Sequence, residues 1–388
     1  MIWLTNNDSS RARTIIVLIK WCCEDFAMVK ENQLSSLRDE IDKIDDMLLN
    51  LLSERAALTQ EVGRLKKDSG SEVEYYRPER EAKIMRRLKG ANKGPLTDES
   101  LVHLMREVIS ACLSCEKALS VAYLGPEGTY THGAMRKHFG SFPEGVPCHE
   151  ISQVFRHVEG GISDYGIVPI ENSVGGSVNQ TLDSLSAGNV KIIGEVTIPI
   201  KHQLLSKGKD LSQITKVFAH EQALMQCSSW LREHLGSVEL IRTSSNAVAA
   251  TKAKGDSQVA AIAGAEAAKI YGLEVLAKNI EDSVRNSTRF IVLGREVPNS
   301  SGSDRTSIMF SASDEAGSLY GVLGILANAD ISMSRIESKP SGEGLWDYTF
   351  FVDFLGHFDD PVVSEAISKM RAKCRIFKVL GSYPISVN

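Results

Sequence analysis

Apolar residues recur at steps of three and four along the N-terminal part of the chain. Such spacing places side chains along one side of a helix, and it is typical of helices that pack against other helices. The pattern therefore predicts a long helix whose apolar row is formed by Leu34, Leu37, Ile41, Ile44, Leu48, Leu51, Leu58, Val62 and Leu65.

One position of this apolar row carries a charge. Arg55 stands between Leu51 and Leu58, where the spacing calls for an apolar residue. Lys66 follows eleven residues later, and at about 100° per residue it returns to nearly the same side of the helix. A buried guanidinium is costly unless an anion meets it. Arg55 therefore indicates either an ion pair with a neighbouring helix or a site for a carboxylated ligand.

Charged residues on the next predicted helix favour the ligand interpretation. Arg38 lies on the first helix, whereas Arg80 and Glu81 open a second helix just after Pro78, a residue suited to a helix start. Several cations beside a carboxyl group on facing helices would suit a small dianion that has to be held in position.

A third helix is predicted over residues 98–118. It turns Cys112 and Glu116 to one side, because side chains four residues apart are neighbours on a helix. The pair Cys112 and Cys115 forms a CxxC, but it lies within this helical pattern and has no second pair, so zinc binding is not predicted there.

The pattern changes near Leu119 to short apolar strands that end in polar turns. The strand Ser120–Leu124 leads into Gly125–Thr129, a glycine-rich turn whose backbone N–H groups can bind an anion. The strand Tyr165–Ile170 leads into polar residues and glycines, which is where open α/β sheets bind ligands. Further strands and a helix over 221–235 predict an α/β region at 119–297, in two lobes with a cleft between them.

The C-terminal part alternates strands and helices in the order βαββαβ, which is typical of the ferredoxin-like fold. It follows a Ser- and Gly-rich linker at 298–304 and is assigned to residues 305–388. The predicted strands are 306–311, 331–338, 348–354 and 376–380, and the predicted helices are 316–327 and 361–372.

Composition limits the possible partners and compartments. A chain of 388 residues has room for two or three domains, and a net charge of −5 gives no reason to expect nucleic acid or an anionic membrane as a partner. The seven cysteines are odd in number and scattered, so a reducing cytoplasm fits better than a disulfide framework. The α/β region contains no metal-ligand spacing and no nucleotide fingerprint, so no metal or cofactor is predicted.

The first 27 residues are predicted to be a disordered extension. Their apolar run, Thr14–Ile19, is too short to cross a membrane, and no small-residue cleavage site follows it. The first folded domain is therefore assigned to residues 28–118.

Four segments, in this order and at these distances, resemble the bifunctional chorismate mutase–prephenate dehydratase family of phenylalanine biosynthesis. They are Gly125–Thr129, Pro169–Ser173, Asn286–Phe290 with its Thr-Arg-Phe, and Lys378–Pro384. The resemblance covers roughly nine-tenths of the chain. It implies an all-helical mutase domain at 28–118, a two-lobed α/β dehydratase domain at 119–297 and an α+β ACT regulatory domain at 305–388.

For the first domain, the resemblance implies that chorismate rearranges to prephenate by a pericyclic shift, which needs positioning and charge stabilisation but no nucleophile or metal. It implies an intertwined helical dimer in which Arg38 comes from the other protomer. Some family members have Asp, Ser and Gln where Arg77, Cys112 and Glu116 stand. The implied catalytic residues are Arg38, Arg55, Lys66, Arg80, Glu81 and Glu116, with Arg77 and Cys112 as substrate-binding residues.

For the second domain, the resemblance implies loss of carbon dioxide and hydroxide from prephenate to give phenylpyruvate. The reaction requires an acid for the leaving hydroxyl and donors for two carboxylates. Thr288 is the implied essential residue, whereas His202 and His220 are interpreted as structural. The implied substrate-binding residues are Thr129, Glu171, Asn172, Ser173, Gln222, Gln226 and Arg289.

For the third domain, the resemblance implies allosteric feedback inhibition by phenylalanine. Two segments match those that hold the effector, although Lys339 stands where Arg is usual. Such domains bind ligand between paired subunits, which implies a homodimer or homotetramer. The implied allosteric residues are Gly317, Ser318, Leu319, Glu337 and Ser338.

Two other functions remain open from the sequence. A dehydratase of this kind can prefer arogenate, which has an amino group where prephenate has a keto group. A two-lobed α/β unit with an ACT domain can also bind an amino acid without turning it over. Loss of chorismate absorbance would separate an enzyme from a sensor, and assays with both substrates would separate the two dehydratases.

Overall fold

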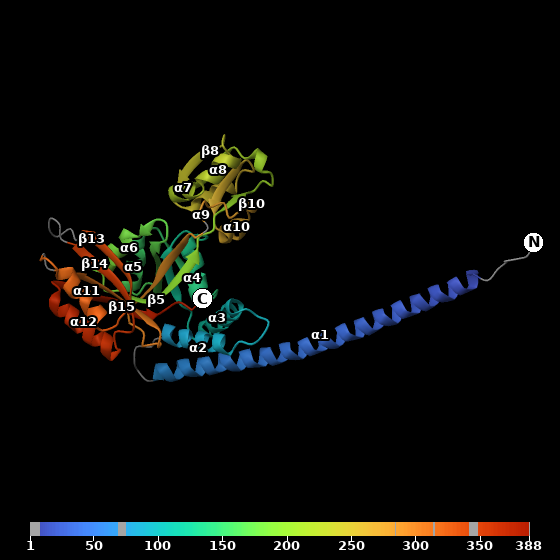
Figure 1. Cartoon of the computed structure of the whole chain (residues 1–388), viewed down its shortest axis with the longest axis horizontal. Coiled ribbons are helices and arrows are strands. Elements are labelled where there is room, and N and C mark those ends of the chain that lie inside the picture. Colours follow the sequence, from blue (N-terminus) through green and yellow to red (C-terminus); the bar gives the residue numbers. More distant parts are fainter. Residues whose placement is uncertain (1–7, 69–74, 284, 313–314, 341–347, 388) are drawn as a thin grey trace, which may run out of the picture. The chain divides into compact units, whose positions relative to one another are not determined.

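The computed structural model describes residues 8–68, 75–283, 285–312, 315–340 and 348–387, with side chains from residue 30 onward. The chain forms two compact units, Met1–Gly70 and Ser71–Asn388. Figure 1 labels many of the helices and strands of both units.

The first unit is a single helix, α1, which runs from Asp8 to Asp68 over 61 residues (Figure 1). The predicted long helix is confirmed, but it starts earlier than expected. No Pro or Gly interrupts the sequence between residues 8 and 62, so nothing in the backbone stops the helix from including residues 8–27. These residues are helical rather than a disordered extension, and residues 1–7 of that prediction lie outside the described residues. Each residue of the apolar row is between 48% and 62% exposed.

The second unit begins with two packed helices. Helix α2 (Pro78–Ala91) starts at a proline, as predicted. Helix α3 (Asp98–Ser114) is capped by Thr97, whose side chain accepts a hydrogen bond from the backbone N–H of Ser100 at 3.2 Å. The helix ends four residues before the predicted end, so Glu116 lies in the turn that follows it. Helices α2 and α3 pack together through a small hydrophobic core of Met85, Val102 and Ile109.

Lobe 1 is built on a mixed sheet with the order β2-β1-β3-β11-β5, and β4 pairs with β3. Strands β2, β1 and β3 are parallel, whereas β11 is antiparallel to both of its neighbours. Three helices pack on this sheet: α4 (Tyr130–Phe139), α5 (Ile151–Glu159) and α6 (Asn179–Ala187). The strands are β1 (Ser120–Leu124), β2 (Glu144–Cys148), β3 (Tyr165–Asn172), β4 (Gly176–Ser177), β5 (Lys191–Pro199) and β11 (Ser287–Gly294).

Lobe 2 lies between β5 and β11 in the sequence, so the chain crosses between the lobes at residues 200–202 and again at 279–286. Its sheet has the order β10-β6-β9-β7-β8. The predicted helix over 221–235 is two shorter helices that meet at Cys227. The elements are β6 (Gln203–Ser206), η1 (Leu211–Gln213), β7 (Lys216–His220), α7 (Glu221–Gln226), α8 (Ser228–His234), β8 (Glu239–Thr243), α9 (Asn246–Ala253), β9 (Val259–Ala263), α10 (Ala265–Tyr271) and β10 (Glu274–Lys278).

The C-terminal domain confirms the predicted βαββαβ order. Its antiparallel sheet has the strand order β13-β14-β12-β15, which is the ferredoxin-like arrangement. Strand β15 runs four residues further than predicted. The elements are β12 (Asp304–Ser311), α11 (Ser318–Asn328), β13 (Met333–Pro340), β14 (Tyr348–Leu355), α12 (Pro361–Lys373) and β15 (Ile376–Pro384).

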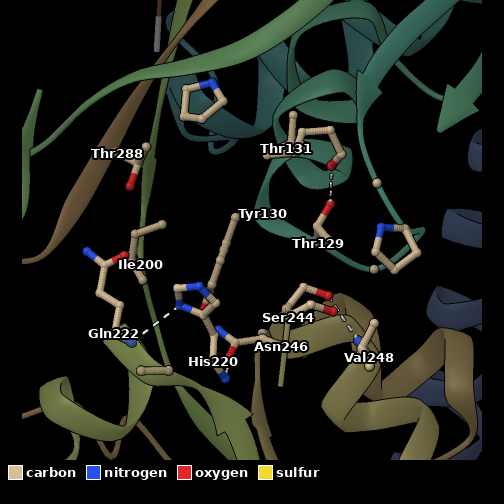
Figure 2. A pocket seen from close by; sticks show the side chains of 18 of the residues that line it. Thr129, Tyr130, Thr131, Ile200, His220, Gln222, Ser244, Asn246, Val248 and Thr288 are labelled. Atoms are coloured by element: carbon tan, nitrogen blue, oxygen red, sulfur yellow. Dashed lines mark hydrogen bonds between the residues drawn. The ribbon is translucent and has the colours of Figure 1, made fainter. Parts of the chain in front are cut away.

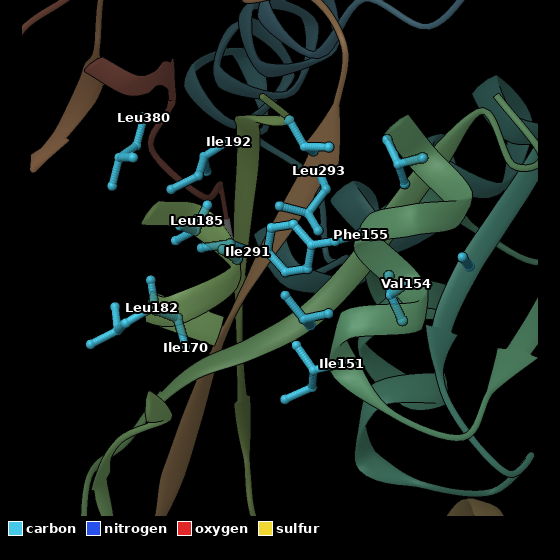
Figure 3. Close-up of a cluster of buried hydrophobic side chains, with 14 of the residues drawn as sticks. Ile151, Val154, Phe155, Ile170, Leu182, Leu185, Ile192, Ile291, Leu293 and Leu380 are labelled. Carbon is cyan, nitrogen blue, oxygen red and sulfur yellow. The ribbon is translucent and has the colours of Figure 1, made fainter. Parts of the chain in front are cut away.

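Lobe 1 and the C-terminal domain share one hydrophobic core. Met309, Phe351, Leu380 and Tyr383 of the C-terminal domain are buried in the same cluster as side chains of β3, β5, β11, α5 and α6. Figure 3 shows Leu380 beside Ile192 of β5. Strand β15 approaches β5 so closely that a Cβ on Gly381 would overlap the carbonyl oxygen of Ile192, so only glycine fits there.

Candidate functional site

A pocket of about 660 Å³ lies between lobe 1 and lobe 2. It is lined by residues at strand ends and helix starts of both lobes. Figure 2 shows Thr288 on one side of this pocket and His220 and Gln222, which come from lobe 2, near it. The side chains that line it include Thr, Ser, Asn, Gln, Tyr and His, and none of its described lining residues is Asp, Glu, Lys or Arg. An anionic ligand would therefore be held here by neutral hydrogen-bond donors.

Thr288 sits at the start of β11 and is 8% exposed. The side-chain amide of Asn172 donates to Thr288 Oγ1 at 2.8 Å and to Asn286 Oδ1 at 2.9 Å. Asn172 Oδ1 accepts hydrogen bonds from the backbone N–H groups of Val174 and Gly175, at 3.1 and 2.8 Å, and these bonds fix the orientation of the amide. Because Thr288 Oγ1 already accepts a hydrogen bond from Asn172, its own proton is available to an acceptor in the pocket.

Two helix N-termini open onto the pocket. Thr129 caps α4, where its Oγ1 accepts from His132 N at 3.3 Å, and Ser245 caps α9, where its Oγ accepts from Val248 N at 3.1 Å. The first turn of a helix carries partial positive charge and unsatisfied N–H groups, which favour anions. These two helix starts give the pocket an anion-binding character that its side chains alone lack.

His202 joins the two lobes beside the pocket. Its Nδ1 lies 3.1 Å from Tyr130 Oη of α4, and its Nε2 lies 2.9 Å from Gln226 Oε1 of α7. Burial lowers the pKa of His202, and burial raises the pKa of Tyr130. Both groups are therefore neutral near pH 7, and His202 serves here as a hydrogen-bonded bridge at the crossing between the lobes.

Five of the residues predicted for the dehydratase site line this one pocket: Thr129, Asn172, Gln222, Gln226 and Thr288. Three others do not. Glu171 forms an ion pair with Arg335 at 3.3 Å, and Ser173 Oγ accepts from Ser287 N at 2.9 Å and donates to Arg285 O at 3.1 Å. Arg289 points away from the pocket into a cluster of buried charges, because neighbouring residues of a strand face opposite sides of the sheet.

Sequence reasoning missed several residues that line the pocket. Tyr130 lies at the lobe crossing beside His202, which was named and interpreted as structural, and Ser245 and Asn246 follow the carboxyl end of β8. The position of the latter two, just beyond a strand, is the signal that would have found them.

The residues predicted for the mutase site fall in the two separate units. Arg38, Arg55 and Lys66 lie on α1, where Arg38 is exposed and the other two are partly buried. In the second unit, Arg77 precedes α2, and its carbonyl oxygen accepts from the backbone N–H groups of Arg80 and Glu81, each at 3.1 Å.

The other mutase candidates of the second unit lie on or near α2 and α3. Glu81 is partly buried and lines a small cavity with Tyr76 and Arg106. Cys112 is buried on α3, and Glu116 is partly buried in the turn after it, where its backbone N–H donates to Leu113 O at 3.0 Å.

The predicted effector residues lie at two places in the C-terminal domain. Gly317, with φ of 84°, precedes α11, and Ser318 and Leu319 are the first residues of that helix. Glu337 and Ser338 lie on β13, where the Glu337 carboxylate accepts a hydrogen bond from Ser177 Oγ of β4 at 2.7 Å. One effector segment therefore contacts lobe 1 directly.

Among the residues that the structure describes, no group of three or more His, Cys, Asp or Glu side chains is arranged to hold a metal ion. Within the same residues, no helix combines the length and apolar character that a bilayer crossing requires.

Three family profiles match the chain in order: chorismate mutase type II over residues 37–117, prephenate dehydratase over 121–298 and the ACT domain over 306–372. A bifunctional chorismate mutase/prephenate dehydratase of Pseudomonas aeruginosa is 44% identical, covering 93% of this chain and 100% of the relative. This chain belongs to the bifunctional chorismate mutase/prephenate dehydratase family. A relative of the same description from Aquifex aeolicus is also 44% identical, over 91% of this chain and 98% of its own length.

Solved structures agree with the dehydratase and ACT domains. A prephenate dehydratase from Arthrobacter aurescens in complex with L-Phe has a TM-score of 0.64 and 34% identity, covering 69% of this chain and 90% of that one. A protein described as a quorum quenching acylase, GqqA, has a TM-score of 0.64 and 28% identity, covering 69% and 98%. The resemblance stated from the sequence is thus confirmed, and the pocket between the lobes belongs to the dehydratase domain.

Proposed function

We propose that the chain rearranges chorismate to prephenate and then converts prephenate to phenylpyruvate, under feedback inhibition by phenylalanine. The observation that carries the dehydratase proposal is Thr288 Oγ1, held by Asn172 at 2.8 Å in the pocket between the lobes. Five cysteines among the described residues are free thiols. Thiols stay reduced in the cytoplasm, so these cysteines support a cytoplasmic location.

In the dehydratase pocket, the electron pair of the bond to the departing carboxylate moves into the ring as carbon dioxide leaves. The ring becomes aromatic when the bond to the hydroxyl group breaks, and that group requires a proton to leave as water. We assign this proton donation to Thr288, whose Oγ1 accepts a hydrogen bond from Asn172 and whose proton is therefore directed elsewhere. The Thr288 oxygen left by this step takes a proton back from solvent once carbon dioxide and water have departed. The starts of α4 and α9 and the amides of Gln222 and Gln226 would hold the carboxylate groups.

For the mutase, we propose that Arg55 and Lys66 hold the carboxylates and the ether oxygen of chorismate, with Arg38, Arg80 and Glu81 completing the site. We also propose at least a homodimer, in which the apolar row of α1 packs against helices of the partner. The exposure of that row, between 48% and 62% for each residue, supports this. The sequence favours a dimer or tetramer, with Arg38 supplied across the interface.

For regulation, we propose that phenylalanine binds between paired ACT domains at Gly317–Leu319 and Glu337–Ser338. Two observations support this site. The Arthrobacter aurescens relative is described in complex with L-Phe. In this chain, Glu337 contacts Ser177, which pairs with Glu171 next to Asn172 of the dehydratase pocket.

Incubating the purified full chain with chorismate tests the function. We expect chorismate absorbance to fall and phenylpyruvate to form, and prephenate to be consumed faster than arogenate in parallel assays. Unchanged chorismate absorbance and no product from either dehydratase substrate would identify an amino-acid sensor instead. Faster conversion of arogenate would reassign the second reaction.

We predict that Glu116→Gln raises mutase activity at neutral pH. If Glu116 acts where a Gln donates a hydrogen bond to the ether oxygen, it can do so only when protonated, and an ionised carboxylate would repel the charge that develops there. The variant should therefore rearrange chorismate faster than the wild type. Mutase rates of the two chains at pH 7 and constant ionic strength check this, and a variant no faster than wild type would exclude the role.

We predict that Gly317→Val removes most of the inhibition by phenylalanine and leaves both activities within about twofold of wild type. Gly317 has a φ of 84°, which a β-branched residue adopts only at a cost, so the effector segment at the start of α11 must move. Gly324→Val, inside the helix that Gly317 precedes, provides a control in which an added Cβ meets no other atom within 4 Å. Equal inhibition by phenylalanine in the two variants would contradict the proposed effector site at Gly317.

A further inference from the structure

Four charged side chains are buried together where the dehydratase domain meets the ACT domain. Arg289 donates to Glu195 Oε2 from Nε at 2.8 Å and to Asp353 Oδ2 from Nη1 at 2.6 Å. Arg305 donates to the same Glu195 oxygen at 2.8 Å. All four side chains are at most 18% exposed. Two cations and two anions balance each other, which is the condition under which buried charges are tolerated.

The partners of Arg289 come from both domains. Glu195 lies on β5 of the dehydratase, whereas Asp353 lies on β14 and Tyr383 on β15 of the ACT sheet. Tyr383 Oη accepts from Arg289 Nη2 at 2.9 Å and lies 2.7 Å from Ser307 Oγ. Ser307 Oγ also donates to Asp353 Oδ1 at 2.6 Å, so the ACT groups around the guanidinium hold one another in place.

Arg289 follows Thr288 directly on β11, and the two side chains leave the strand on opposite sides. Thr288 and Phe290 line the dehydratase pocket, whereas Arg289 reaches the buried charge cluster. Because one planar peptide joins Thr288 to Arg289, a displacement of the Arg289 backbone moves the Thr288 backbone as well. Burial tends to lower the pKa of Arg289, but Tyr383, Asp353 and Glu195 raise it, so the guanidinium stays charged.

We propose that Arg289 is a positioning residue for the dehydratase reaction. Asp353 and Tyr383 of the ACT sheet hold its guanidinium by hydrogen bonds, and this fixes the position of the Thr288 hydroxyl in the pocket. The inference rests on the proposed role of Thr288. It gives Arg289 a role that involves no contact with substrate. It also means that the ACT domain contributes to the rate of dehydration even when no effector is bound.

A comparison of two buried hydroxyl groups on β15 tests the proposal. Tyr383→Phe removes the hydroxyl that bonds to Arg289. Ser382→Ala removes the neighbouring hydroxyl, which is equally buried but lies 2.6 Å from Thr306 Oγ1 and accepts from Phe358 N at 3.1 Å. Both variants lose buried hydrogen bonds of the ACT sheet, and only the first loses one to Arg289. Arg289→Lys is the second variant, because an ammonium keeps the charge but cannot reach three partners in a planar fork.

We expect Tyr383→Phe to lower kcat for prephenate about tenfold, with KM within about twofold, because Arg289 loses one of its hydrogen bonds to the ACT sheet and Thr288 is then less accurately placed. Arg289→Lys should lower kcat further, and Ser382→Ala should stay within about twofold of wild type. The mutase activity of the same chains should change little in all three, which controls for folding.

Equal kcat values for Tyr383→Phe and Ser382→Ala would overturn the proposal, because the loss would then reflect general weakening of the ACT sheet. An Arg289→Lys variant that raised KM with kcat unchanged would also overturn it, since that result is the mark of a substrate contact. The wild-type chain is assayed alongside the variants. If the wild type itself does not dehydrate prephenate, the proposed function has failed, and this result is distinct from failure of the proposal about Arg289.

Discussion

Thr288→Val should abolish dehydration of prephenate, so that chorismate supplied to the variant accumulates as prephenate. Val keeps the branched shape of Thr and removes only the hydroxyl that Asn172 orients at 2.8 Å. Loss of a group that donates a proton in the transition state costs between about a hundredfold and ten-thousandfold in rate. We therefore expect kcat to fall by about a thousandfold, measured as phenylpyruvate formed from prephenate.

Thr288→Ser is the matched control for this variant. It keeps the hydroxyl and removes only a methyl group, so it should retain dehydratase activity within about tenfold. Mutase activity should be unchanged in both variants, because all residues proposed for that reaction precede residue 118. If Thr288→Val dehydrated prephenate as fast as Thr288→Ser, the proton would have to come from another group in the pocket.

Arg55→Ala should abolish mutase activity while prephenate is still dehydrated. Arg55 is the one charged residue within the apolar row of α1, and we propose that its guanidinium meets the charge of chorismate. Removal of such a preorganised donor costs about a hundredfold to a thousandfold in rate. The measurement is the loss of chorismate absorbance, with prephenate conversion assayed in the same preparation.

Arg64→Ala is the control for a cation on the same helix. The Arg64 side chain is 73% exposed and pairs with Glu61 one turn away, so its removal should leave mutase activity unchanged. Equal loss in both variants would indicate that charge along α1, and not a site at Arg55, supports the reaction. Loss of both enzyme activities in a folded Arg55→Ala variant would argue against two separate sites.

The elements that the sequence predicted well are those with strong local patterns. The 3–4 spacing in α1, the proline at the start of α2 and the βαββαβ order of the C-terminal domain are each encoded within a short stretch. The errors occurred where no residue in the sequence marks the beginning or the end of a helix. Residues 8–27 continue a helix without Pro or Gly, and the helix predicted over 221–235 divides at Cys227, a residue with no helix-breaking character.

The candidate site was predicted only in part, because its geometry depends on contacts between distant segments. Thr129, Asn172 and Thr288 could be found from strand ends and motifs. Arg289 was placed in the substrate pocket because it adjoins Thr288 in the motif, although alternation along a strand sends the two side chains to opposite faces. Tyr130 and Ser245 belong to different lobes, and no local pattern indicates that the order of strands brings them to one pocket.

The hydrophobic core shared by lobe 1 and the ACT domain limits how this enzyme can be freed from its inhibitor. Cutting the chain at the linker near residue 298 would expose Ile192 to solvent and leave the charges of Glu195 and Arg289 without Asp353. A regulatory domain that looks removable in the sequence is thus part of the scaffold of the catalytic one. Relief of inhibition would therefore be sought by point substitutions in the effector segments, because a chain cut at the linker would lose the core and the ion pairs that the two domains share.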